Sequence, residues 1–246
     1  MSVITEQHNP GLSGLLQAPA AGALVAGLPY GEAIRRISRG PADSQRDYRQ
    51  LIAVLGEPGT IGQIDTVEAV PPVITVAAGL ADVDVTVALL DEVWQRPFLI
   101  ATGATRAEAT SAQHVIATSA LSIAQLSQLC TGDALHPENG ARVFAAVDGL
   151  GTTAGQAGPG AAELRLSGPG IVGERRLFVS GLSVEFFDAL MLANADFPAG
   201  IDLIMLTPAG QMAAIARSTH IQLSEPGAAA PHTAHRTPHT AQEGNA

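Results

Sequence analysis

The sequence contains no lysine, so all 13 of its Lys or Arg residues are arginines. A chain without lysine cannot form a Schiff base with pyridoxal phosphate or with a carbonyl substrate. It also lacks the lysine of the GxxxxGK[ST] loop, whose ammonium group binds the phosphates of a nucleotide. The sequence therefore excludes both of these chemistries. We expect no cofactor.

Cysteine is nearly as scarce, because Cys130 is the single one. One cysteine allows no disulfide within the chain, no thiolate zinc site and no CxxC redox pair, which favours a reducing cytoplasm. Cys130 with His114 or His136 would make a nucleophile pair, but nothing in the local sequence supports one. A buried structural thiol is the default interpretation.

Positive charge is also in short supply, since the net charge is −10. This balance argues against electrostatic binding of nucleic acid or of anionic membranes. Residues 11–28 carry no charge, but Pro19 and several glycines interrupt them, which argues against a membrane span. Residues 1–10 lack the basic start of a signal peptide. We therefore expect a cytoplasmic protein.

Hydrophobic residues are plentiful at 46%, and their spacing predicts where regular structure begins. Ser44 and Asp47 have the spacing of a capping box, which predicts the start of a helix. The helix over residues 44–55 should bury one apolar face, formed by Tyr48, Leu51, Ile52 and Leu55. It should end at Pro58-Gly59, and a short strand should follow within residues 60–65.

The remaining apolar segments predict alternating helices and strands. Further helices are expected over residues 80–90, 121–130 and 180–193, the last with Ser183 as its cap. Strands are expected over residues 96–101, 114–118, 142–147 and 163–168, and a hairpin after residue 201 with a turn at 207–210. Residues 148–162 are expected to form a flexible glycine-rich surface loop. The pattern predicts one α/β domain over residues 44–224, between an extension (1–43) and a disordered tail (225–246).

Asp202 is the first candidate site residue, because it interrupts the apolar run of residues 201–206. On a strand it would point away from Ile201, Leu203 and Met205. It then either caps a neighbouring N–H at the edge of the sheet or presents a buried carboxylate to a ligand. The second role carries the cost of burying an unpaired charge.

Two arginine clusters are candidates for anion binding. Arg217, Thr219 and His220 close the last apolar run, and they either bind phosphate or form a solvated strand end. Glu174 and Arg175 either bind an anion or join a surface salt-bridge network. The histidines of the tail have helical spacing, but flanking prolines disfavour a helix, so we expect no metal site: His232, His235 and His239.

Taken together, four motifs resemble one known family. They are YRQLIAVLGEPGTIG (48–62), TGDALHPENGARVF (131–144), LRLSGPGIVGER (164–175), and FPAGIDLIML (197–206) with AIARSTHI (214–221). The family is phosphonate metabolism protein H, the H subunit of the bacterial carbon–phosphorus lyase core complex. The motifs occur in the family's order and together span about residues 46–223.

The resemblance implies a fold like that of the pyridoxal-phosphate-dependent transferases, without the cofactor. It implies a homodimer that assembles with subunits G, I and J. That complex transfers an alkylphosphonate onto the ribose of a nucleoside triphosphate and releases adenine. The resemblance gives this subunit no catalytic residue, so an accessory role is expected. The alternative is a stand-alone phosphonate- or nucleotide-binding protein or enzyme that uses arginines near Arg49, Arg175 and Arg217.

Overall fold

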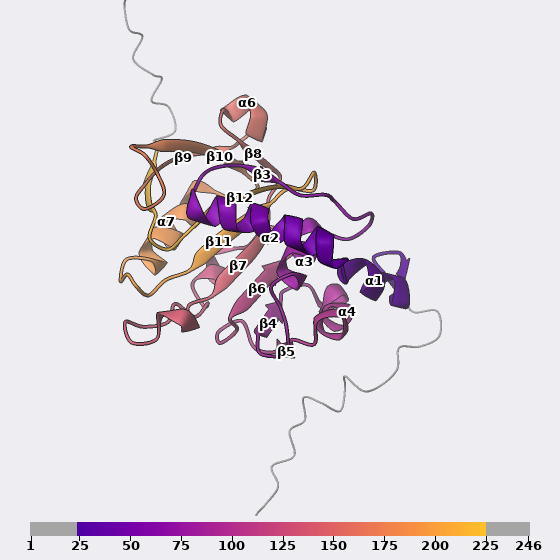
Figure 1. Cartoon of the computed structure of the whole chain (residues 1–246). Helices are drawn as coiled ribbons and strands as arrows, with labels where there is room; N and C mark the ends of the chain where they lie inside the picture. The colour runs from indigo at the N-terminus through magenta and orange to yellow at the C-terminus, as the bar shows by residue number, and fades with distance from the viewer. Residues whose placement is uncertain (1–23, 225–246) are drawn as a thin grey trace, which may run out of the picture.

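The computed structural model describes residues 24–224 of the chain (Figure 1). The expected disordered tail lies outside the described residues. Regular structure begins before residue 44, with a hairpin of β1 (Leu24–Val25) and β2 (Leu28–Pro29) and then helix α1 (Tyr30–Ile37). The boundary predicted at residue 44 is therefore too late, because Ala33 and Ile37 of α1 are buried in the same core as the central sheet.

A seven-stranded sheet forms the centre of the molecule, in the order β3-β12-β11-β7-β6-β4-β5. Strands β11, β7, β6, β4 and β5 run parallel, whereas β12 and β3 are antiparallel to their neighbours. Their bounds are β3 (Gly62–Gln63), β4 (Thr86–Leu89), β5 (Thr105–Arg106), β6 (His114–Ala117), β7 (Arg142–Ala146), β11 (Asp202–Leu206) and β12 (Gln211–Ile215). The central strands are apolar along both faces, as expected of parallel strands covered on both sides.

A second, four-stranded antiparallel sheet lies beside the first, in the order β13-β9-β10-β8. Its strands are β8 (Gly149–Gly151), β9 (Ala162–Ser167), β10 (Arg175–Ser180) and β13 (His220–Leu223). Along β9, buried residues alternate with more exposed ones, so one face of this sheet packs inward.

The helices cover the central sheet on both faces (Figure 1). Buried residues of α1, α2 (Pro41–Gly56), α3 (Pro72–Ala78) and α4 (Glu92–Thr102) share one core cluster. Buried residues of α5 (Ile123–Leu126), α7 (Val184–Ala193) and the second sheet share the other. The short helix α6 (Ala154–Ala157) lies next to β8.

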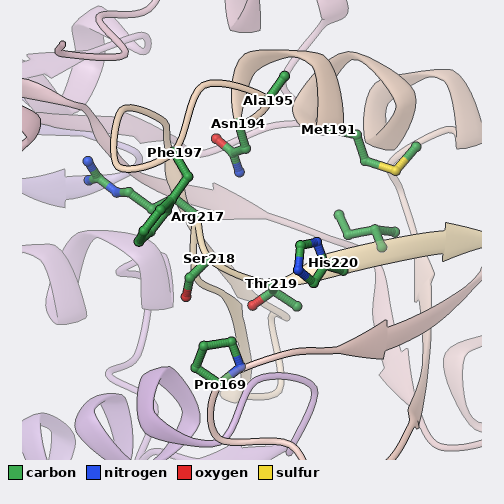
Figure 2. A pocket seen from close by; sticks show the side chains of 10 residues that line it. Pro169, Met191, Asn194, Ala195, Phe197, Arg217, Ser218, Thr219 and His220 are labelled. Atoms are coloured by element: carbon green, nitrogen blue, oxygen red, sulfur yellow. The ribbon is translucent and has the colours of Figure 1, made fainter. Parts of the chain in front are cut away.

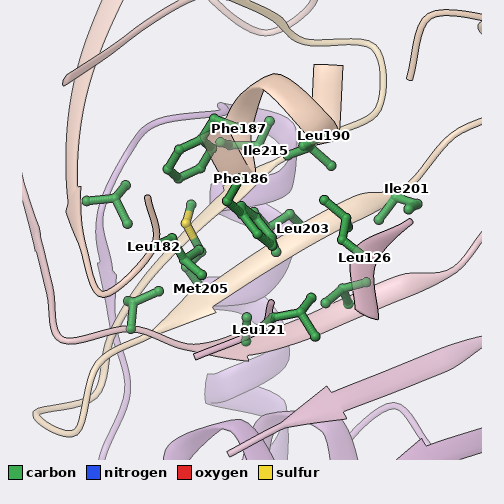
Figure 3. Packing of buried hydrophobic residues seen from close by; sticks show 14 of the residues in the cluster. Leu121, Leu126, Leu182, Phe186, Phe187, Leu190, Ile201, Leu203, Met205 and Ile215 are labelled. Atoms are coloured by element: carbon green, nitrogen blue, oxygen red, sulfur yellow. The ribbon is translucent and has the colours of Figure 1, made fainter. Parts of the chain in front are cut away.

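Strand β11 shows how the sequence assigns residues to the two cores. Leu203 and Met205 belong to the cluster that contains α7, where Figure 3 shows them beside Phe186. Ile204 and Leu206 belong to the cluster that contains α2 and α3. This is the alternation expected from the apolar run, and the predicted hairpin of β11 with β12 is confirmed.

Helix α2 confirms the predicted helix but corrects its start and its buried face. It begins at Pro41, and its N-cap, Gly40, forms no side-chain cap, so Ser44 and Asp47 make no capping box. Asp47 is buried and pairs with Arg39. The buried face is therefore Asp47, Leu51 and Val54, whereas Tyr48 and Ile52 are 50% and 49% exposed.

Two predictions between residues 80 and 101 are wrong. Residues 86–89 form strand β4 rather than a helix, and the helix lies earlier, in α3. Residues 96–101 lie inside α4, where Asp91 caps the helix by accepting a hydrogen bond from the N–H of Val93. A short apolar run fits a strand and a buried helix equally well, and here the cap decides between them.

Residues 148–162 were predicted to be a loop, but they contain the buried strand β8 and helix α6. Gly149 and Gly151 let the two backbones approach closely: a Cβ at Gly149 would lie 2.2 Å from the carbonyl oxygen of Ala157. The predicted helix at 121–130 is only the single turn α5, with a capping box between Ser122 and Gln125. The predicted strands β6, β7 and β9, and helix α7 with its Ser183 cap, are confirmed.

Candidate functional site

Arg217 joins three of the motif segments at one point, which we call the Arg217 junction. Its Nη2 lies 2.8 Å from Oδ2 of Asp202, and its Nε and backbone N–H both donate to Oδ1. Its Nη1 donates to the carbonyl oxygen of Pro137 at 2.6 Å, and its Nη2 lies 3.4 Å from that of Gly140. The side chains of Arg217 and Asp202 are only 15% and 17% exposed, so this is a largely buried ion pair.

Two glycines make room for this arginine. A Cβ on Gly140 would lie 2.3 Å from the carbonyl oxygen of Gly200 and 2.6 Å from Nη1 of Arg217. Gly200 has a φ of +143°, and a Cβ there would lie 2.6 Å from Oδ1 of Asn194. That same Oδ1 accepts a hydrogen bond from the N–H of Ile201 at 2.7 Å. The junction thus depends on the absence of side chains at both glycines.

Asp202 therefore caps a neighbouring N–H, one of the two roles expected from the sequence. The expected position at the edge of the sheet is wrong, because Asp202 is the first residue of β11, and β11 has β7 and β12 as neighbours. Its carboxylate is occupied by Arg217 rather than presented alone.

A second junction links the other two motif segments. Arg175 donates through Nη1 to the carbonyl oxygens of Glu57 and Pro58, at 3.1 and 2.8 Å. Nearby, a Cβ on Gly170 would lie 2.0 Å from the carbonyl oxygen of Gly56. Glu174 lies on the surface, 3.7 Å from Nη1 of Arg165, which fits the predicted salt-bridge network. Arg175 thus binds the end of α2 to the second sheet.

A cavity of about 440 Å³ opens beside the Arg217 junction (Figure 2). We call it the Thr219 cavity; its lining residues include Pro169, Met191, Phe197, Ser218, Thr219 and His220. Thr219 is 7% exposed and its hydroxyl has no hydrogen-bond partner within residues 24–224. The structure thus places Thr219 and His220 together on this wall, where His220 is exposed. Most of the other lining residues are apolar.

A second cavity of about 280 Å³, the Arg142 cavity, also borders Arg217. Its lining residues are Leu80, Val85, Gln113, His114, Glu138, Gly140, Arg142 and Arg217. His114 begins β6 and Arg142 begins β7, and the two residues pair in register, as Arg142 does with Asp202 of β11. The first residues of these adjacent parallel strands thus form a row of polar groups at one end of the strands.

Within this row, Nη1 of Arg142 lies 3.2 Å from Nε2 of His114. Burial, and then the charge of Arg142, lower the pKa of His114 to about 4, against a weaker opposing effect of Asp82. The imidazole is therefore neutral at pH 7, so Nε2 accepts from Arg142 and Nδ1 carries the proton. That Nδ1–H, and Nε of Arg142, are buried without a partner among the described residues.

Arg142 is not among the site residues predicted from the sequence, which suggests His114 only as a partner of Cys130. In the structure His114 contacts Arg142 instead, and Nδ1 of His136 lies 3.2 Å from Glu138. A signal for Arg142 and His114 is present in the sequence, because each is a charged or polar residue at the start of a buried apolar strand. The same pattern identified Asp202.

Arg49 lies apart from both junctions. It is exposed on α2 and lines a separate cavity of about 300 Å³ with Arg46, Gln63 and Asp65. Across residues 24–224, no cluster of His, Cys, Asp or Glu side chains has the arrangement of a metal site. No helix in that range is long and apolar enough to span a membrane. The tail histidines lie outside the described residues.

These features define a mixed α/β protein in which charged residues at the strand starts hold distant motif segments together. The chain belongs to the bacterial phosphonate metabolism protein (PhnH) family, whose model matches residues 37–222. This confirms the resemblance seen in the motifs. A protein of Stutzerimonas stutzeri, named putative C-P lyase subunit protein HtxG, is 39% identical to the chain over 92 residues. That match covers 37% of this chain and 43% of the relative, so it spans less than half of the relative's length.

Proposed function

We propose that the chain is an accessory subunit of a carbon–phosphorus lyase complex. Family membership supports a role in phosphonate metabolism, and the name of the relative supports a subunit of that complex. The observation that carries the accessory role is the state of Arg217, whose side-chain donors contact Asp202 and two backbone carbonyls. A guanidinium held in this way stabilises the fold rather than a reacting substrate.

In this proposal the chain supports the transfer of an alkylphosphonate onto the ribose of a nucleoside triphosphate, with release of adenine. It does so as a homodimer that assembles with subunits G, I and J. We also propose that its central sheet is a version of the pyridoxal-phosphate-dependent transferase fold, adapted to a chain without lysine. The mostly parallel order of the strands is compatible with that relationship.

The apolar lining of the Thr219 cavity, with exposed apolar residues close to it in the chain, supports a partner-binding role. Phe197 lines this cavity and is 63% exposed, and Leu192, next to the lining residue Met191, is 79% exposed. Val172, in the same loop as Pro169, is 98% exposed. Exposed apolar side chains around a concave site are typical of protein interfaces, in which aromatic anchors carry much of the binding energy.

The test is co-expression of the chain with the neighbouring genes of its genome, followed by purification and an assay of adenine release from a nucleoside triphosphate and methylphosphonate. The proposal expects a stoichiometric complex whose activity requires this chain. It fails if the chain purifies alone and the other subunits are fully active without it. It also fails if the isolated chain alone releases adenine, which would support the stand-alone alternative.

A further inference from the structure

We propose that the Arg142 cavity binds a small tetrahedral oxyanion, a phosphate or phosphonate group, through Arg142 and Gln113. This site is distinct from the surface that the proposed function assigns to partner subunits. It also has a ligand that can be tested on the isolated chain. The inference rests on free hydrogen-bond donors, unbalanced positive charge and cavity size.

The first argument is the supply of free donors at the cavity wall. The side-chain Oε1 of Gln113 accepts hydrogen bonds from the backbone N–H and the hydroxyl of Thr86, at 3.0 and 3.3 Å. This fixes the side chain and leaves its NH₂ group without a partner in the described part of the chain. Arg142 has five N–H donors, and the described residues offer it one acceptor, Nε2 of His114.

The second argument is the charge of Arg142. No carboxylate within residues 24–224 lies within ion-pair distance of it, whereas the neighbouring Arg217 is neutralised by Asp202. His114, whose Nε2 lies 3.2 Å from Nη1 of Arg142, is neutral at pH 7 because its pKa is about 4. A half-buried guanidinium without a counter-ion is costly, and its planar array of donors matches an oxyanion.

Negative charge near the cavity opposes the binding of an anion. Glu138 lines the cavity, but its side chain is 67% exposed and lies 3.2 Å from Nδ1 of His136. Water and salt therefore screen its charge. Asp82 slightly raises the pKa of His114 and does not lie within ion-pair distance of Arg142. Glu138 should weaken the binding of an anion without preventing it.

The third argument is size. The cavity holds about 280 Å³, just below the range of roughly 300 to 1,000 Å³ that is usual for drug-sized ligands. It therefore has ample room for inorganic phosphate or a short alkylphosphonate. It lies at the starts of the parallel strands, whereas ligands of open α/β sheets generally bind beyond the carboxyl ends. It is thus separate from the usual crevice of such a sheet.

The experiment is calorimetric titration of the isolated full-length chain with inorganic phosphate, methylphosphonate and acetate at low ionic strength. We expect one saturable site per chain for the first two ligands and weaker binding of acetate. Arg142→Gln should lower the affinity for phosphate at least tenfold, and Gln113→Leu should lower it several-fold. Glu138→Gln should raise it, because it removes the nearby negative charge. The matched control is Arg49→Gln, an exposed arginine at a different cavity, which should leave binding unchanged.

Melting curves test whether each variant is folded, and phosphate should raise the melting temperature of the wild type but not that of Arg142→Gln. If Arg142→Gln does not fold, the other two cavity variants still test the proposal, because Gln113→Leu should lower the affinity for phosphate and Glu138→Gln should raise it. The proposal is overturned if the wild type shows no saturable phosphate binding. It is also overturned if acetate binds as tightly as phosphate, or if Arg49→Gln weakens binding as much as the cavity variants. Assembly with partner subunits is scored separately, so loss of the proposed complex does not affect this result.

Discussion

At the scale of single residues, the chain places its polar groups where buried strands begin. His114, Arg142 and Asp202 are the first residues of three adjacent parallel strands and pair in register. Each has a specific partner, so the free energy lost on burying it is partly recovered. Removing one member of such a pair leaves the other buried without compensation.

Replacing Asp202 with asparagine should lower the free energy of unfolding by about 3 kcal/mol, because Arg217 would remain buried without its carboxylate. Urea denaturation measures this change. The control is Glu174→Gln, which removes an exposed 3.7 Å contact with Arg165 and should cost about 1 kcal/mol or less. Equal, small losses in both variants would show that the Asp202 pair does not stabilise the fold.

His114 gives the stability a defined pH dependence. Its pKa falls from 6.5 in the unfolded chain to about 4 in the folded one, so between these values the unfolded chain binds more protons. Stability should therefore fall as the pH drops from 6.5 towards 4, by up to about 3 kcal/mol from this residue. Unfolding curves of the wild type and of His114→Gln across this range test this, and the variant should show a flatter profile. Parallel profiles would refute the assignment.

At the scale of elements, periodicity alone finds a helix but not always its orientation. The sequence predicted the helix at 44–55 and its end near Pro58-Gly59. It did not reveal that Asp47 pairs with Arg39, which turns Tyr48 and Ile52 outward. The strand predicted at 96–101 is wrong for a related reason. A short apolar run does not distinguish a strand from a buried helix, and the residue that caps this helix, Asp91, precedes the run.

The corrected face of α2 predicts different effects for adjacent residues. Leu51→Ala should lower the free energy of unfolding by about 2 to 5 kcal/mol, because Leu51 is 1% exposed in the core. Ile52→Ala, on the half-exposed side of the same helix, should cost about 1 kcal/mol or less. Denaturant titration of the two variants distinguishes the faces. Similar losses in both would mean that Ile52 is buried and that the predicted face was right.

The glycines of the Arg217 junction make a prediction about backbone packing. Gly140→Ala should destabilise the fold by about 1 to 3 kcal/mol or more, because its Cβ would lie 2.3 Å from the oxygen of Gly200. Gly155→Ala in α6 is the control, since a Cβ there meets nothing within 4 Å, and alanine favours a helix. Thermal melting should therefore separate the two variants clearly. A Gly140→Ala protein as stable as the control would contradict the close packing described here.

At the scale of the whole molecule, the candidate site was only partly predictable. The sequence identified Asp202, Arg217, Thr219 and His220, and the structure brings them together around one junction. It did not reveal the pairing of Arg142 with His114, because nothing local indicates that this arginine faces a neutral histidine 28 residues away in the chain. Pairings between strands depend on register across the sheet, which a single sequence does not specify.

The central claim is that the chain acts as a subunit whose exposed surface beside the Thr219 cavity contacts its partners. The most direct measurement is co-purification, from cells that express the neighbouring genes, of the wild type, Phe197→Asp and Val83→Asp. Phe197 lines the cavity, whereas Val83 is an exposed apolar residue, 70% accessible, that does not line it. We predict that Phe197→Asp loses its partners while its melting curve stays close to that of the wild type, and that Val83→Asp keeps them. A Phe197→Asp protein that still assembles at full stoichiometry would contradict this account.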